Sequence, residues 1–138
     1  MTTITFAAEA KLEEEKVRVY VKDSELVVGT IGSDYPTPEE LLLSAALSCL
    51  LLTLLYVARE MEVHLEEVDG YIEGDLDPAG FNGGAVPPGV LEVRYFVKVR
   101  SSDPRVSDVL NASERRCPLK DTLTRSVRVR VNWQLVHT

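Results

Sequence analysis

Two cysteines are the residues of this chain whose type and setting suit redox or nucleophilic chemistry. Cys49 lies inside the apolar run 41–58, and Cys117 lies directly before Pro118. A thiol acts as a nucleophile once it is ionised, but a lone cysteine in a leucine- and alanine-rich helix is more often a small apolar core residue. The sequence therefore raises the question whether the two thiols work as a pair.

The composition is that of one globular domain. With 138 residues, of which 45% are hydrophobic and 27% charged, the chain predicts a single domain over residues 1–138. The start MTTITFAAEAKLEEEK lacks the basic and apolar parts of a secretion signal, so we expect a cytoplasmic protein with reduced thiols. A formal net charge of -7 disfavours nonspecific binding to nucleic acid, which depends on cations against phosphate.

The apolar run predicts a long helix from Thr37 to Arg59 with a marked beginning. Thr37 suits the N-cap, Pro38 the first helical position, and Glu40 completes a capping box. The run just reaches the length of a membrane span. Four polar residues interrupt it, however: Ser44, Ser48, Cys49 and Thr53. We therefore expect no membrane span but a helix buried on nearly all sides, which in so small a protein requires a partner subunit.

Alternating and apolar segments predict strands on both sides of this helix. They are residues 4–12, 16–22, 26–32, 62–76 and 90–102, with a turn at 23–26 and a Gly/Pro loop at 77–89. A closing strand at 126–136 is expected to turn its alternate apolar residues inward, and these are Val127, Val129, Val131, Trp133 and Leu135.

Two further helices are predicted before the closing strand. The first spans 103–117 with Asp103 as N-cap and breaks before Pro118, and a short one follows at 118–123. The order of elements predicts an α+β fold, a mostly antiparallel sheet packed on a long buried central helix.

Other patterns add little chemistry. The two histidines, His64 and His137, form no credible zinc site with two unpaired cysteines, so no metal is expected. No glycine-rich phosphate loop links a strand to a helix. The basic residues of the last strands fall on polar faces, which we interpret as solvated, with a surface for an acidic partner as the alternative. These residues are Arg94, Lys98, Arg100, Arg128 and Arg130.

Two motifs give a resemblance to a known family. The segment PEELLLSAALSC, which ends at Cys49, and the segment CPLKDTL, which begins at Cys117, resemble the two cysteine segments of the OsmC/Ohr family of osmotically inducible and organic-hydroperoxide-resistance proteins. The resemblance implies an OsmC-like fold and an intertwined homodimer.

The resemblance also implies a cofactor-independent thiol peroxidase. Cys49 would attack an organic hydroperoxide and become a sulfenic acid, Cys117 would condense with it into a disulfide, and an external dithiol, lipoyl-type or thioredoxin-like, would reduce that disulfide. The alternative is a catalytically weak module of the same fold that binds a small lipophilic or thiol-bearing ligand.

In the family a glutamate at the position of Glu39 pairs with an arginine that activates the cysteine. About ten residues of helix separate Glu39 from Cys49, a rise of about 15 Å, so Glu39 is too far to touch Cys49 of its own helix. It would then serve the Cys49 of the other subunit. The plainer alternative is that Glu39 only stabilises the positive end of the helix.

The arginine is where this sequence departs from the family pattern. Glu15 or Lys16 stands near the place where active family members carry it, and Arg18 is the nearest arginine. A thiol among leucines needs a nearby cation to ionise at neutral pH. We therefore predict that Arg18 or Lys16 approaches Cys49, with Arg115 and Arg116 next in line.

Overall fold

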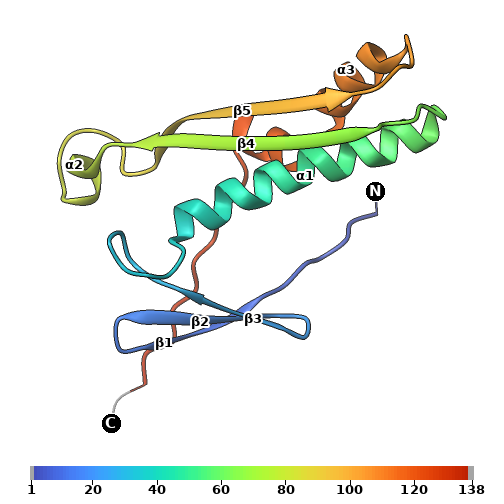
Figure 1. Ribbon diagram of the computed structural model, residues 1–138. Coiled ribbons are helices and arrows are strands. Elements are labelled where there is room, and N and C mark those ends of the chain that lie inside the picture. The colour runs from blue at the N-terminus through green and yellow to red at the C-terminus, as the bar shows by residue number, and fades with distance from the viewer. Residues whose placement is uncertain (1, 137–138) are drawn as a thin grey trace. The chain divides into compact units, whose positions relative to one another are not determined.

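The computed structural model describes residues 2–136. Over these residues the elements run β1 Glu9–Glu13, β2 Lys16–Val21, β3 Ser24–Val28, α1 Pro38–Glu60, β4 Glu67–Leu76, α2 Pro78–Phe81, β5 Val90–Arg100, α3 Val106–Arg116 and α4 Pro118–Thr124 (Figure 1). β1, β2 and β3 form one antiparallel sheet, and β4 pairs with β5 in a second. The predicted α+β class with antiparallel sheets is confirmed.

The contacts of the chain divide it into two compact units. The first unit holds the residues up to Ala45 together with Tyr71–Phe96, and the second holds Ala46–Gly70 together with the residues from Val97 onward. Because α1, β4 and β5 each contribute to both units, neither unit is a continuous stretch of sequence. The prediction of one domain over 1–138 stays a prediction.

The sheet of the first unit is a meander with two-residue turns. Glu13 pairs with Lys16 and Val21 with Ser24, so the chain reverses at Glu14–Glu15 and at Lys22–Asp23. The second reversal corrects the turn predicted at 23–26. The first strand begins at Glu9 rather than at residue 4, and the side chains of Ile4 and Phe6 before it are exposed. In the register that pairs Glu9 with Tyr20, residues 4–7 extend beyond Val21, the last residue of β2, and have no partner strand there.

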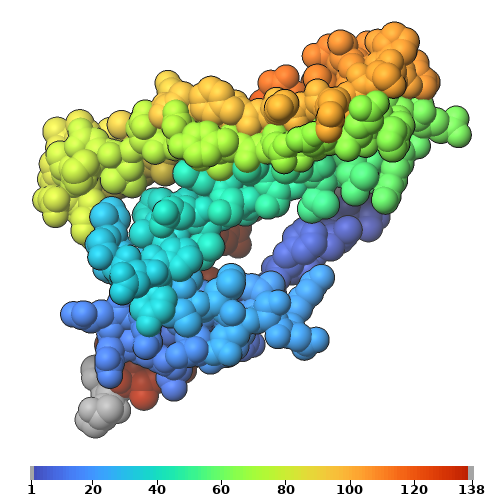
Figure 2. Space-filling model, viewed as in Figure 1, coloured from blue at the N-terminus to red at the C-terminus, as the bar shows by residue number. Residues whose placement is uncertain are grey.

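A tight loop leads from β3 into α1. The backbone N–H of Gly29 donates to the carbonyl of Pro36 at 2.9 Å. A side chain on Gly29 would place its Cβ 2.2 Å from the Ser33 Oγ, so any other residue here would force the Ser33 hydroxyl away from the Tyr35 N–H, from which it accepts at 3.2 Å. Figure 2 shows this loop, in light blue and cyan, against the strands of the same unit.

Helix α1 begins with the predicted capping box. The backbone N–H of Glu40 donates to Thr37 Oγ1 at 3.2 Å, and the backbone N–H of Thr37 donates to Glu40 Oε1 at 2.9 Å. These bonds satisfy two backbone donors that a helix start otherwise leaves open. The Thr37 backbone N–H, together with the Thr37 hydroxyl at 3.0 Å, donates to the Glu40 carboxylate and lowers its pKa.

In the single chain α1 is buried on one face only, so the burial predicted on nearly all sides, which requires a partner subunit, stays a prediction. Only Ala46, Leu54, Val57 and Ala58 of this helix are buried. Leu52 is 65% exposed and Tyr56 is 62% exposed. By length and composition α1 could cross a membrane, a test that the core helices of soluble proteins also pass. An apolar helix covered on one face only leaves a surface that the single chain does not bury.

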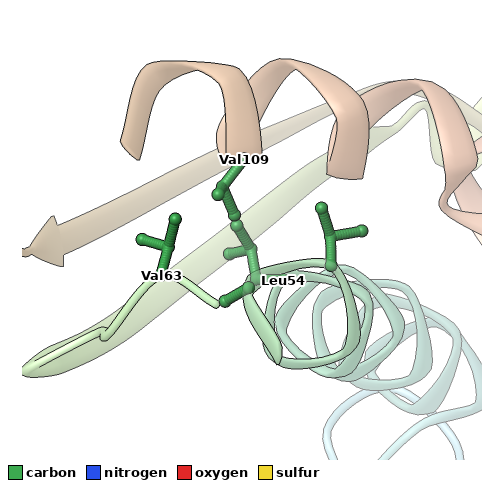
Figure 3. Packing of buried hydrophobic residues seen from close by; sticks show 5 residues of the cluster. Leu54, Val63 and Val109 are labelled. Carbon is green, nitrogen blue, oxygen red and sulfur yellow. The ribbon is translucent and has the colours of Figure 1, made fainter. Parts of the chain in front are cut away.

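The core of the second unit joins α1 to α3. Leu54, Val57 and Ala58 pack with Val63 and Val109, and Val109 is fully buried (Figure 3). At about 25 cal/mol for each Å² of apolar surface removed from water, such contacts supply the main stabilisation of this unit.

Asp103 does not cap α3 as predicted. It accepts from the Arg105 backbone N–H at 2.8 Å and from the Arg105 guanidinium, so the helix begins only at Val106. The same guanidinium donates to the carbonyls of Met61 and Glu62. Arg105 therefore binds carbonyls just beyond the end of α1. The strand predicted from residue 62 starts at Glu67 instead.

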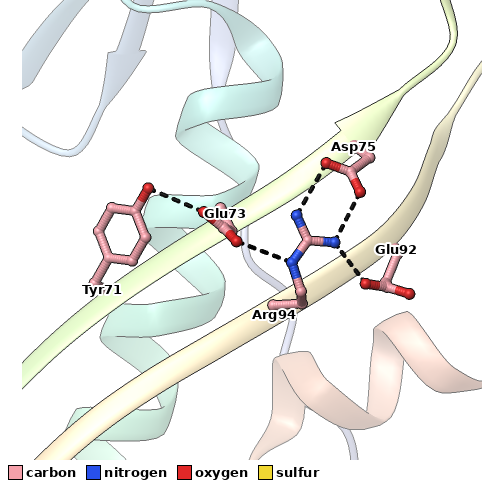
Figure 4. A network of polar contacts seen from close by, with 5 residues as sticks. All are labelled: Tyr71, Glu73, Asp75, Glu92 and Arg94. Atoms are coloured by element: carbon pink, nitrogen blue, oxygen red, sulfur yellow. Dashed lines mark hydrogen bonds and ion pairs between the residues drawn. The ribbon is translucent and has the colours of Figure 1, made fainter.

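On the polar face of the β4–β5 pair, charged side chains of the two strands form ion pairs with one another. Arg94 donates to Glu73 at 2.9 Å, to Asp75 at 2.7 and 2.9 Å, and to Glu92 at 2.5 Å (Figure 4). The carboxylates raise the pKa of Arg94 further above its usual range. Since these carboxylates already surround Arg94, the alternative of a surface for an acidic partner loses this residue.

The structure differs from the prediction at two further places, one in the loop 77–89 and one near the end of the chain. The loop 77–89 contains the short helix α2, capped by Asp77, whose side chain accepts from the Ala79 N–H at 2.9 Å. The prediction of a closing strand is wrong, because residues 126–136 form no strand in the described chain and Trp133 is 92% exposed. An alternating segment becomes a strand only where another strand offers it hydrogen bonds, and none does so here.

We expect Thr37→Ala to lower the free energy of unfolding by about 1 kcal/mol, because the capping hydroxyl is lost. Thr37→Ser keeps the hydroxyl and should stay close to wild type. Chemical denaturation at one fixed protein concentration measures both. Equal stability of the alanine and serine variants would contradict a role for the cap.

Candidate active site

The two cysteines come together in the second unit. Cys49 lies half-buried in the middle of α1, and Cys117 is buried where α3 ends and α4 begins. Pro118 opens α4, and Cys117 has extended backbone geometry, which breaks the helix as predicted. Both thiols are free, and the Cys117 thiol is a hydrogen-bonding neighbour of the Cys49 thiol. The arrangement suits conversion of the pair into a disulfide.

The surroundings of Cys49 keep its thiol protonated. Burial is the main cause that raises its pKa, and the Cys117 thiol raises it further. The backbone N–H of Leu119 and the hydroxyl of Thr53 act in the opposite direction. None of these influences is a cation, so within the described chain Cys49 has a smaller thiolate fraction at neutral pH than an ordinary thiol.

Thr53 gives the thiolate little help. Its hydroxyl donates to the Cys49 carbonyl at 2.7 Å. A hydroxyl has one proton, and this short bond uses it. The backbone N–H of Leu119 therefore remains the main group that supports a negative charge on the Cys49 sulfur.

Of the two arginines directly before Cys117, Arg116 forms an ion pair with Glu60 and Arg115 is exposed. Arg116 donates to the Glu60 carboxylate at 2.9 and 3.4 Å, and its guanidinium lies 5.6 Å from the centre of the Tyr56 ring. Glu60 raises the pKa of Arg116, and Arg116 lowers that of Glu60. Arg115 is exposed at the end of α3. Arg116 would have to leave an ion pair to serve Cys49.

Arg18, Lys16 and Glu39 belong to the first unit rather than to the unit of the thiols. Arg18 donates to Glu13 at 3.1 Å and to Glu25 at 2.7 Å across the sheet. The Lys16 ammonium lies 5.7 Å from the centre of the Tyr35 ring. Glu39 lies in the first turn of α1. Their approach to Cys49 stays a prediction.

One feature of the first unit was missed by the sequence analysis. A groove of about 720 Å³ lies among the sheet, the start of α1 and the α2 region, and both Glu15 and Glu39 line it. Glu15 belongs to a turn and Glu39 to a helix start, so no spacing in the sequence joins them. Among residues 2–136, no three histidine, cysteine or carboxylate side chains are grouped to hold a metal ion.

Comparison with known proteins identifies the family. The family model described as OsmC-like protein matches residues 31–132. No curated protein matches the chain by sequence. The match includes both cysteine segments on which the sequence-based resemblance rests, and that resemblance is confirmed.

Solved structures show the same fold. The OsmC-like protein of Mycoplasma pneumoniae is 18% identical with a TM-score of 0.79, and the alignment covers 99% of this chain and 100% of that one. The organic hydroperoxide resistance protein of Elizabethkingia anophelis is 17% identical with a TM-score of 0.70, covering 89% and 90%. For the organic hydroperoxide resistance protein OhrB of Bacillus subtilis the identity is 17%, the TM-score 0.59 and the coverage 88% and 91%.

At 17–18% identity, the similarity to solved structures shows only the fold, whereas the match to the family model shows the family. The paired thiols, the helix that carries Cys49 and the antiparallel sheets agree with both. Since the family model spans residues 31–132 of 138, the chain belongs to the OsmC-like family.

Proposed function

We propose that this protein is a cysteine-based peroxidase that reduces organic hydroperoxides. The observation that carries the proposal is the contact of the Cys49 and Cys117 thiols across α1 and the α3–α4 junction. The family match and the names of two structural neighbours, organic hydroperoxide resistance proteins, support it. We assign the protein to the cytoplasm, where both thiols stay reduced between turnovers.

The chemistry takes three balanced steps. The Cys49 thiolate attacks the outer oxygen of the hydroperoxide, the O–O bond breaks, and the alkoxide that leaves takes up a proton to become an alcohol. Cys49 is then a sulfenic acid. The Cys117 sulfur attacks the Cys49 sulfur, water leaves, and a disulfide forms. An external dithiol, lipoyl-type or thioredoxin-like, exchanges with this disulfide and is itself oxidised to a disulfide.

We further propose that the active form is an intertwined homodimer. Leu52 and Tyr56 on α1 and the apolar residues after Ser126 are exposed in the single chain, which leaves a large surface for a partner. In such a dimer Glu39 and Arg18 or Lys16 of one chain would serve Cys49 of the other. A cation there would offset the burial that raises the Cys49 pKa.

The alternative function is a catalytically weak module of this fold that binds a small lipophilic or thiol-bearing ligand. The raised pKa of Cys49, with no cation among its causes, favours this alternative. The two functions differ in whether a charge reaches the thiol in the assembled protein.

The two cysteines should fail in different ways. Cys49→Ser should abolish consumption of tert-butyl hydroperoxide, because the nucleophile is gone. Cys117→Ser should consume about one equivalent and then stop, with Cys49 trapped as a sulfenic acid that overoxidises. Peroxide assays with a dithiol, and mass spectrometry of the Cys49 peptide, measure this. Equal multi-turnover activity of both variants would sink the assignment.

The pH dependence of Cys49 alkylation separates the two functions. A raised pKa means that the thiolate fraction falls about tenfold for each pH unit below it, so alkylation should be slow at neutral pH unless a cation lowers the midpoint. If the peroxidase proposal holds, Arg18→Ala or Lys16→Ala should move the midpoint upward by about one pH unit.

Lys22→Ala, in a turn of the same sheet, removes an equal charge and serves as the control. The activating role of Arg18 and Lys16 is refuted when neither substitution moves the midpoint more than the control does. Arg115 and Arg116 are then tested next.

The homodimer should show in the environment of Trp133. This single tryptophan is 92% exposed in the single chain, so a partner that covers it should shift its fluorescence to shorter wavelength and protect it from iodide quenching. Leu52→Asp should weaken the dimer, because it places a charge in the interface, whereas Ser107→Asp on α3 should not. A folded monomer at micromolar concentration in light scattering would contradict the proposal.

A further inference from the structure

The two sulfurs of the candidate pair differ in their access to solvent. Cys117 is 1% exposed, and Ser113, one turn earlier in α3, is fully buried. The carbonyl of Cys117 accepts from the Asp121 N–H at 3.1 Å, which fixes this residue at the start of α4. Cys49, by contrast, is only half-buried in the middle of α1. A reagent in solution therefore reaches the Cys49 sulfur, whereas the Cys117 sulfur is covered by the chain.

This difference should persist once the two cysteines are joined. The thiols are hydrogen-bonding neighbours in the reduced protein, so a short movement of the side chains makes the bond. The end of α3 and the beginning of α4, which hold Cys117, need not part for that movement. The proposed peroxidase also requires a path from solvent to Cys49, because a hydroperoxide has to reach this sulfur, and it requires no such path to Cys117.

The identity of the leaving thiol favours attack at Cys49 as well. In thiol–disulfide exchange the attacked sulfur keeps the new bond, and the other sulfur departs as a thiolate. Attack at Cys117 would expel Cys49, whose pKa is raised mainly by burial. Because a thiol with a raised pKa leaves slowly, this route is disfavoured. Access and leaving group thus point to the same sulfur.

We propose that the dithiol that reduces the Cys49–Cys117 disulfide attacks the Cys49 sulfur, so that the mixed disulfide forms on Cys49 and Cys117 is the leaving group. One thiolate of the reductant bonds to the Cys49 sulfur, the Cys49–Cys117 bond breaks, and Cys117 departs as a thiolate that takes up a proton. The second thiolate of the reductant then attacks the reductant's own sulfur in the mixed disulfide. Cys49 departs as a thiolate, and the reductant is oxidised to a disulfide. The inference rests on the proposed peroxidase and deepens it, because it gives the two cysteines different roles in the reductive steps.

The test locates the first bond that a thiol makes with the oxidised protein. Wild-type protein is oxidised to the disulfide with diamide, freed of the reagent, and mixed with 2-mercaptoethanol, a small neutral monothiol. Samples are quenched in acid at successive times, unfolded, and treated with N-ethylmaleimide at mildly acid pH. Mass spectrometry of the peptides then shows which cysteine carries the probe and which carries the maleimide. The earliest samples identify the attacked sulfur, because later exchange can move the probe.

We expect at least about tenfold more probe on Cys49 than on Cys117 in the earliest samples, with the maleimide on Cys117. The same oxidised protein unfolded in urea is the matched control. Unfolding exposes both sulfurs and removes the burial that raises the Cys49 pKa, so the probe should then divide between the two cysteines within about threefold.

Three outcomes would overturn the inference. The first is a probe found mainly on Cys117, or shared about equally, in the folded protein. The second is an equal preference for Cys49 in the unfolded protein, which would mean that the local sequence and not burial directs the attack. The third is a folded disulfide that takes up no probe on either sulfur.

A parallel sample oxidised with one equivalent of tert-butyl hydroperoxide separates this inference from the proposed function. A disulfide that forms with diamide but not with the hydroperoxide would contradict the peroxidase, whereas the diamide sample still decides which sulfur is attacked. A disulfide that forms with both oxidants, followed by attack at Cys117, would leave the peroxidase standing and reject only the assignment of the attacked sulfur.

Discussion

The packing of α3 against the C-terminal half of α1 is the constraint on which the thiol pair depends. Val109 of α3 is fully buried against Leu54 and its neighbours, and this contact fixes how α3 crosses α1. Because Cys117 directly follows α3 and Pro118 forbids the helix to continue, the Cys117 thiol is delivered to the side of α1 that carries Cys49. The Arg116–Glu60 ion pair ties the same two helices together at the surface.

The same packing limits the reactivity of the pair. Burial brings the thiols together in apolar surroundings, and these surroundings disfavour the thiolate that every redox step requires. A stable core and a reactive cysteine therefore make opposite demands on α1. The fold supplies a neutral donor, the Leu119 N–H, as the main support for a thiolate, and Arg116 is held at the surface by Glu60. A charge that lowers the pKa has to come from outside this core.

Local rules predicted the elements whose causes lie within a few residues. The Thr37–Glu40 box, the strand β2 and the break at Pro118 each follow from neighbouring side chains, and the structure confirms them. The side chains of β2 do not alternate in exposure, however, because Arg18 is half-buried like Val17 and Val19. The prediction that Asp103 caps α3 was wrong because Asp103 accepts from Arg105 instead. The Arg105 guanidinium also binds two carbonyls after α1. That contact spans distant parts of the chain, and no local pattern announces it.

The candidate site also has one part that the sequence predicted and one that it did not. The importance of Cys49 and Cys117 came from a resemblance between two motifs, and the structure then joined the thiols through tertiary packing. The groove with Glu15 and Glu39 could not be predicted, because a turn and a helix start far apart in sequence build it.

The failed prediction of the closing strand shows what one chain leaves incomplete. Val129 is 77% exposed, Leu135 79% and Trp133 92%, although the alternation of this segment is that of a half-buried strand. Leaving such side chains in water forgoes about 1.5–3 kcal/mol for each large apolar residue. A strand pattern also needs a neighbour with free backbone groups. The sequence of this segment is therefore consistent with a strand whose partner lies outside the single chain, and the homodimer that we propose would supply such a partner.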